Sequence, residues 1–81
     1  MNYVYILQSE QDGRYYIGST NNLERRLKEH LRGKTHSTKR MLPLKFVFGK
    51  EFNTFVEARQ EERRLKKQKS HKYIENYVKV R

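Results

Sequence analysis

The side chains with the clearest chemical potential are a tyrosine, an arginine and a histidine whose spacing brings them together. Tyr16 ends a strand-like segment, and Arg26 and His30 follow it in a segment with a helical pattern. Leucines recur every four residues from Leu23 to Leu31 and form an apolar stripe. At about 100° per residue, Arg26 and His30 lie on the edge of that stripe, one turn apart. A cation and a titratable ring beside a buried stripe, close to a tyrosine, indicate a functional site.

A second candidate is Glu62, which lies in the middle of the apolar face predicted for a later helix. That face is built from Phe55, Ala58 and Leu65. A carboxylate in such a position is costly unless it is paired or bound to a cation. Two interpretations follow: a salt bridge, for example to Arg26, or a metal ion.

The elements that must position these residues begin with three aromatic and β-branched segments near 2–8, 14–18 and 45–52, which predict strands. An Asp-Gly pair between the first two predicts an antiparallel hairpin. This pairing places Tyr5 and Tyr16 on neighbouring strands with both hydroxyls on one side. The alternative is that both rings serve only in packing, with their hydroxyls at the surface.

The helix starts and stops are marked by capping residues. Gly33 is a suitable C′ stop for the first helix, and Thr54 with Glu57 matches a capping box for the second. Glu57 and Glu61 lie off the apolar face of that second helix. We expect helices near 22–32, 55–68 and 73–78. The predicted fold class is therefore α/β (α+β), a small three-stranded antiparallel sheet flanked by helices, in one domain spanning residues 1–81.

The composition favours an anionic partner. The chain has 81 residues and a net charge of +10, from 19 Lys and Arg against 9 Asp and Glu. Nucleic acid is the first candidate for so basic a domain, although the ribosome or an acidic membrane surface would suit the same charge. Cysteine is absent, which excludes disulfides and thiolate zinc sites. Without a long apolar run or a signal-peptide core, we expect a cytoplasmic protein with no membrane partner.

The motifs also carry a family resemblance. Tyr16-Ile17-Gly18, followed by Arg26 and His30, resembles the second half of the GIY-YIG nuclease signature, and Tyr3-Val4-Tyr5 is a variant of the first half. Glu62 matches the single metal-binding acid of that family. The ordered set covers nearly the whole chain and is most similar to the small stand-alone bacterial members.

The resemblance implies a metal-dependent endonuclease that hydrolyses DNA phosphodiester bonds. Glu62 would hold Mg²⁺, with Mn²⁺ as an alternative, and Arg26 would neutralise the scissile phosphate. Tyr5 would deprotonate or orient the attacking water, while Tyr16 and His30 would complete the hydrogen-bond network. Which tyrosine takes the proton stays open at this point.

Two basic segments are predicted to bind nucleic acid through its phosphates. One is the polar loop at 33–43, and the other runs from Arg59 to Lys72 with seven basic residues against two acids. A mobile, solvated loop and a solubilising helix face are the alternatives. The nucleic-acid-binding candidates are Lys34, Lys39, Arg40, Arg63, Lys66, Lys67 and Lys69.

The sequence departs from the family pattern in its Tyr-Val-Tyr first motif, and we expect no appended DNA-binding domain. We therefore expect little sequence specificity, action on unusual or single-stranded DNA or with a protein partner for targeting, and a role in DNA repair or recombination. Two alternatives of other classes are a nucleic-acid-binding module with negligible turnover, on DNA or RNA, and an adaptor whose basic helices bind a protein. The oligomeric state stays open, as does a site role for Asn76, a residue type that some relatives place in the site.

Overall fold

A central sheet of three antiparallel strands organises the protein. The structure, a computed structural model, describes residues 1–79. The strands are β1 (Asn2–Ser9), β2 (Tyr15–Thr20) and β3 (Leu44–Phe52). Their order is β2-β1-β3, with both neighbours antiparallel to β1. β2 is thus an edge strand, which pairs with β1 on one side and, within residues 1–79, with no other strand of this sheet on the other.

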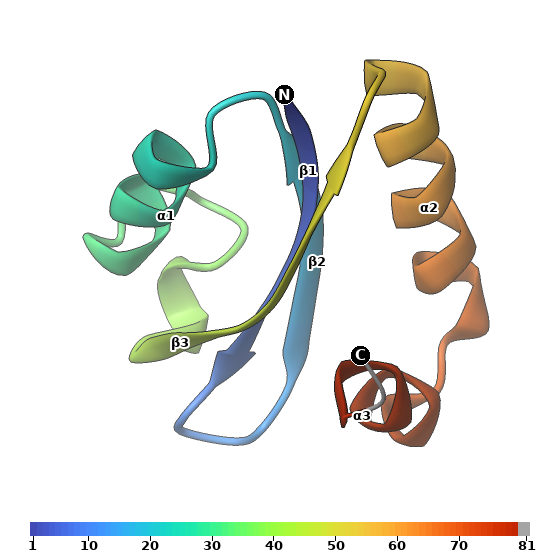
Figure 1. Cartoon of the computed structure of the whole chain (residues 1–81). Coiled ribbons are helices and arrows are strands. Elements are labelled where there is room, and N and C mark those ends of the chain that lie inside the picture. Colours follow the sequence, from blue (N-terminus) through green and yellow to red (C-terminus); the bar gives the residue numbers. More distant parts are fainter. Residues whose placement is uncertain (80–81) are drawn as a thin grey trace.

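Helices cover both faces of this sheet. They are α1 (Leu23–Leu31), α2 (Phe55–Gln68) and α3 (His71–Lys79), with a short 3-10 turn, η1, at Lys39–Met41. Figure 1 shows α1 on one side of the sheet and α2 with α3 on the other. The predicted α/β class with a three-stranded antiparallel sheet is confirmed.

Local sequence signals fix the helix ends. The side chain of Asn22 accepts a hydrogen bond from the amide of Arg25 and caps α1. Gly33 ends the same helix with φ at 76°, a conformation that glycine adopts without strain. Thr54 and Glu57 form the predicted capping box of α2. The caps at Asn22 and Thr54 thus start α1 shortly after β2 and α2 shortly after β3.

Two apolar clusters lie on the opposite faces of the sheet, because alternate residues of a strand point to opposite sides. The buried residues between the sheet and helices α2 and α3 are Val4, Ile6, Ile17, Phe48, Ala58, Leu65 and Ile74. Those on the α1 face are Tyr5, Leu7, Met41 and Leu44, with Tyr16, Leu23, Leu27 and Leu42 partly buried against them.

Two details of the predicted apolar faces are wrong. Leu31 is 51% exposed, and the neighbouring His30 is fully buried in its place, not at the edge of the stripe. The hydrogen bonds that satisfy the His30 ring allow this burial. Phe55 is 53% exposed, and its ring contacts the Arg59 guanidinium at 5.5 Å from the centroid instead of packing on the sheet.

The loop at 33–43 is anchored. Thr38 and Met41 are buried, and the η1 turn begins directly after Thr38. The alternative of a wholly solvated loop is therefore wrong. Separately, no helix within residues 1–79 is both long and apolar enough to cross a membrane.

Candidate active site

Tyr5, His30 and Thr38 form a buried hydrogen-bonded chain on the α1 face of the sheet. The Tyr5 hydroxyl and His30 Nε2 share a hydrogen bond of 2.9 Å, and His30 Nδ1 shares one of 2.8 Å with the Thr38 hydroxyl. A neutral imidazole carries one N–H, so it donates to one hydroxyl and accepts from the other. The histidine thus links the tyrosine on β1 to the loop before β3.

Tyr16 and Arg26 lie beside this chain. Tyr16 is on the same face as Tyr5, and its ring centroid lies 6.3 Å from that of Tyr5 and 5.1 Å from that of His30. The Arg26 guanidinium is 34% exposed and pairs with Glu29 at 2.9 Å. The structure therefore brings together four of the five predicted catalytic residues.

Burial controls the ionisation of this cluster. It raises the pKa of Tyr5 to about 12, against the opposing effect of the hydrogen-bonding Arg26 guanidinium. Burial also lowers the pKa of His30, and the positive charge of Arg26 lowers it further. In the absence of another cation, Tyr5 is a neutral phenol and His30 a neutral imidazole at pH 7.

Gly18 explains how the Tyr5 ring reaches the edge of the sheet. It is the β2 residue paired with Tyr5. A Cβ atom added to Gly18 would lie 2.6 Å from the Tyr5 hydroxyl oxygen and 2.7 Å from Cζ. The tyrosine therefore lies directly over the bare backbone of Gly18, with its hydroxyl at the edge strand.

Glu62 approaches the same point of β2 from the opposite face. Ser19, the residue after Gly18, donates a hydrogen bond of 2.6 Å to its Oε1. Lys66 Nζ lies 2.7 Å from Oε2, and Arg59 lies 3.6 Å from Oε1. The expected salt-bridge partner, Arg26, is wrong, because α1 and α2 lie on opposite faces of the sheet.

The two halves of the site are close enough to interact. The negative charge of Glu62 contributes to the raised pKa of Tyr5. Burial alone raises the pKa of Glu62, but hydrogen bonds from Lys66 and Ser19 outweigh it and lower the pKa overall. Glu62 is therefore an ionised carboxylate, and the site extends around the β2 edge.

The donor set bears on which metal this carboxylate suits. Within residues 1–79, no three His, Cys, Asp or Glu side chains gather in a metal-binding group. Mg²⁺ is usually held by one or two carboxylates and keeps several waters, whereas structural zinc takes four protein ligands. The single Glu62 carboxylate, 13% exposed, supplies the one protein ligand that a hydrated Mg²⁺ ion needs, and Lys66 is the cation that would have to move aside.

The neighbouring acid Glu61 has a different environment. It accepts hydrogen bonds from the Tyr77 hydroxyl and from Arg64, both at 2.7 Å. Its side chain, predicted to lie off the apolar face of α2, is only 18% exposed because α3 covers it through Tyr77. The Arg64 guanidinium lowers the pKa of Glu61 to about 2. Glu61 braces α2 against α3, while Asn76 is exposed on α3.

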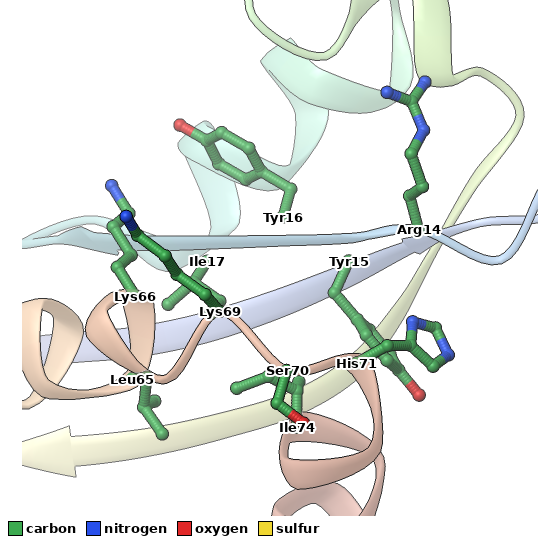
Figure 2. Close-up of a pocket in the computed structure, with 10 residues that line it drawn as sticks. All are labelled: Arg14, Tyr15, Tyr16, Ile17, Leu65, Lys66, Lys69, Ser70, His71 and Ile74. Carbon is green, nitrogen blue, oxygen red and sulfur yellow. The ribbon is translucent and has the colours of Figure 1, made fainter.

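Five of the seven predicted nucleic-acid-binding residues line pockets, in three places. Lys66 and Lys69 line a pocket of about 380 Å³ beside Tyr16, at the junction of α2 and α3 (Figure 2). Lys39 and Arg40 line a second pocket, on the loop before β3. Arg63 lines a third near the start of α2, and Lys34 and Lys67 are exposed.

Sequence reasoning missed two residues that contact the site. Ser19 could have been found, because alternation along β2 puts it on the face of Ile17, toward α2. Thr38 carried no signal, since nothing local distinguishes it from the other hydroxyls of its loop. The i,i+4 spacing of Glu62 and Lys66 also predicts their ion pair.

Comparisons with known proteins identify the family. The sequence profile of the family described as the GIY-YIG catalytic domain matches residues 1–76. A UPF0213 protein of Bacillus licheniformis is 42% identical over 77 residues, covering 90% of this chain and 78% of that protein. The UPF0213 protein YazA of Bacillus subtilis is 35% identical over 78 residues, covering 91% of this chain and 79% of that protein.

A solved structure is similar as well. The solution NMR structure of the UPF0213 protein BH0048 from Bacillus halodurans matches with a TM-score of 0.63 and 35% identity. The match covers 100% of this chain and 86% of that one. Profile, relatives and solved structure all point to one family, and the chain belongs to the GIY-YIG domain family of nucleases and, within it, to the UPF0213 proteins.

Proposed function

We propose that this protein is a metal-dependent DNA endonuclease that hydrolyses phosphodiester bonds with little sequence preference, acting through one domain of residues 1–81. The observation that carries the proposal is the convergence at the β2 edge. The hydrogen-bonded pair Tyr5 and His30 reaches it from one face, and the ionised Glu62 from the other. Phosphodiester cleavage needs an acid–base group and a cation close to one phosphate.

Glu62 would hold Mg²⁺, with Mn²⁺ as a substitute. Such a cation, when bound, supplies a Lewis acid that polarises a phosphoryl oxygen and makes water a stronger acid. Ser19 fixes the rotamer of Glu62 through its 2.6 Å hydrogen bond. Lys66, at 2.7 Å, balances the carboxylate charge before a cation binds and is then free to contact phosphate.

Arg26 would neutralise the scissile phosphate. Its planar guanidinium matches two phosphate oxygens. At 34% exposure the guanidinium is accessible from solvent. Its ion pair with the partly exposed Glu29 is weak, so a phosphate can displace that carboxylate. When substrate binds, its phosphate would replace the Glu29 carboxylate as the partner of the Arg26 guanidinium.

Tyr5 and His30 would handle the proton of the attacking water. In the free protein Tyr5 is neutral, with a pKa of about 12. A cation at Glu62 would favour its phenolate, because an adjacent positive charge stabilises the ionised form. The Tyr5 hydroxyl proton would pass to the neutral His30 at Nε2, whose ring Thr38 holds in place, and the resulting phenolate would accept the proton of the attacking water. Tyr16, beside both rings, would steady the phosphate.

The basic surface supports a nucleic-acid substrate. The net charge is +10. The pocket lined by Lys66 with Lys69 and the pocket lined by Lys39 with Arg40 both include Arg14, the residue before β2. Such contacts hold the backbone and carry no base information. Sequence preference is accordingly expected to be low.

The test is nicking of end-labelled single-stranded, duplex, flapped and branched DNA, with Mg²⁺, with Mn²⁺ and with chelator. Tyr5→Phe is compared with Tyr3→Phe, which removes a hydroxyl from the same face of β1 outside the cluster. We expect cutting that requires the cation, survives in Tyr3→Phe and is lost in Tyr5→Phe.

Two outcomes would contradict the proposal. Cutting that persists at the wild-type rate in chelator would remove the metal dependence. Salt-sensitive binding without cutting on any of these DNAs would favour a nucleic-acid-binding module instead. Both variants need circular dichroism first, to show that they fold.

A further inference from the structure

We propose that the pocket between β2 and the α2–α3 junction binds one unpaired nucleotide of the substrate strand, adjacent to the scissile phosphate. The inference rests on the proposed nuclease function and specifies its substrate class. The pocket measures about 380 Å³, within the roughly 300–1,000 Å³ of small-ligand sites. Figure 2 shows side chains of β2, α2 and α3 arranged around it.

Its position adjoins the candidate active site. Tyr16 forms part of the pocket wall and also packs against His30 at 5.1 Å. Lys66 lines the pocket and binds Glu62 at 2.7 Å. These two shared residues place an occupant next to the phosphate that Arg26 and Glu62 would act on.

The charge of the pocket suits a nucleotide. Arg14, Lys66 and Lys69 line it, and none of its lining residues is acidic. Within residues 1–79, Lys69 has no carboxylate partner, whereas Arg14 and Lys66 each have one. In Figure 2 both lysines extend toward the side of β2 on which the Tyr16 hydroxyl lies. Phosphates flanking the bound nucleotide would meet these cations there.

The apolar floor of the pocket suits a base that is neither paired nor stacked in a duplex. It is formed by the apolar side chains of Ile17, Leu65 and Ile74. Beside it the rings of Tyr15 and His71 lie 4.7 Å apart at an interplanar angle of 30°. A base inside a duplex has both faces covered by its neighbours. Only an unstacked base can place a face on this apolar and aromatic surface.

A strand leaving the pocket has a continuous basic path. Arg14 lines this pocket and also the second one, about 740 Å³ in volume, with Lys39 and Arg40. The path runs past the start of β2. A single strand could therefore contact both basic segments that the sequence predicted to bind nucleic acid.

The experiment measures binding in chelator, so that it does not depend on cutting. The probes are fluorescein-labelled hexathymidylate and an abasic hexamer with the same number of phosphates, followed by anisotropy. Wild type is compared with His71→Ala, and with Phe55→Ala, which removes an exposed aromatic ring outside the pocket. A second pair is Lys69→Gln and Lys28→Gln, which change the net charge equally; Lys28 is exposed on α1 and lines neither basic pocket.

We expect wild type to bind hexathymidylate about fivefold or more tightly than the abasic hexamer, since stacking on an aromatic side chain is worth about that much per base. The ratio of the two affinities should fall toward one in His71→Ala and stay at the wild-type value in Phe55→Ala. Lys69→Gln should lower the salt slope of binding by about 0.7, the loss of one phosphate contact on a single strand, and Lys28→Gln should leave the slope closer to that of wild type. Equal binding of the two hexamers, or a preference retained in His71→Ala, would overturn the proposal. A protein that shows this preference but never cuts DNA would refute only the nuclease function.

Discussion

Replacing Gly18 by alanine should disturb the site more than any other single methyl group added to the sheet. The new Cβ would stand 2.6 Å from the Tyr5 hydroxyl oxygen and 2.7 Å from Cζ, about 0.8 and 0.7 Å inside the 3.4 Å where ordinary contact begins. Tyr5 cannot swing away, because it is 1% exposed and bonded to His30. Gly18 has no positive φ, so the effect would be steric.

Gly49→Ala is the matched control. Gly49 pairs with Tyr5 from the other neighbouring strand, and its Cβ would meet Phe46 Cζ at 2.7 Å. Phe46 is 45% exposed, so that ring can move into solvent. We expect Gly18→Ala to cost about 2 kcal/mol, as overpacked cores do, and Gly49→Ala less than half of that.

Thermal denaturation followed by circular dichroism measures the difference. A loss of about 2 kcal/mol should lower the Tm of Gly18→Ala by about 8–16 °C in a domain of this size. Because a displaced reactive group can cost about a hundredfold in rate, nicking should fall by that order in Gly18→Ala. Adding Tyr5→Phe should recover only part of the stability, since Cζ remains in the way. Equal Tm values for the two alanine variants would refute this account of how Tyr5 is placed.

Thr38→Val leaves His30 Nδ1 buried without its partner and should cost about 1–3 kcal/mol in urea denaturation; an unchanged midpoint would contradict the hydrogen-bonded chain. Because the pKa of His30 is lowered in the folded protein, the unfolded protein binds a proton at this residue before the folded protein does as the pH falls below about 6.5. The free energy of unfolding should therefore decline from about pH 6.5 down to the folded pKa, and His30→Asn should remove that decline. In calorimetric titration Glu62→Gln should abolish Mn²⁺ binding, whereas Lys66→Gln should tighten it about two- to fivefold by removing a competing cation; equal affinities would mean that Lys66 does not compete.

Much of the fold could be predicted because its signals are local. Strand alternation, the Thr54 capping box and the Gly33 stop each depend on a few neighbouring residues, and all are observed. The placement of Tyr5 and Tyr16 on one face followed from the same alternation.

The parts that failed depend on contacts between distant segments. No local pattern places the Thr38 hydroxyl against His30, because that contact needs the loop folded back onto α1. The partner of Glu62 is not predictable from the sequence, because the sequence does not say which face of the sheet each helix covers. Phe55 fits the helical wheel as well as Leu65 does, but only the path of α2 over the sheet decides which of them is buried.

The central claim is that Glu62 holds the cation for cleavage at the β2 edge. The measurement that tests it most directly is the initial rate of DNA nicking in Mg²⁺ by wild type, Glu62→Gln and Glu51→Gln. Glu51 is an exposed acid on β3 outside the site, so its replacement controls for the lost charge. We predict a rate at least about a hundredfold lower in Glu62→Gln and a wild-type rate in Glu51→Gln. A folded Glu62→Gln protein that cuts as fast as wild type would contradict the claim.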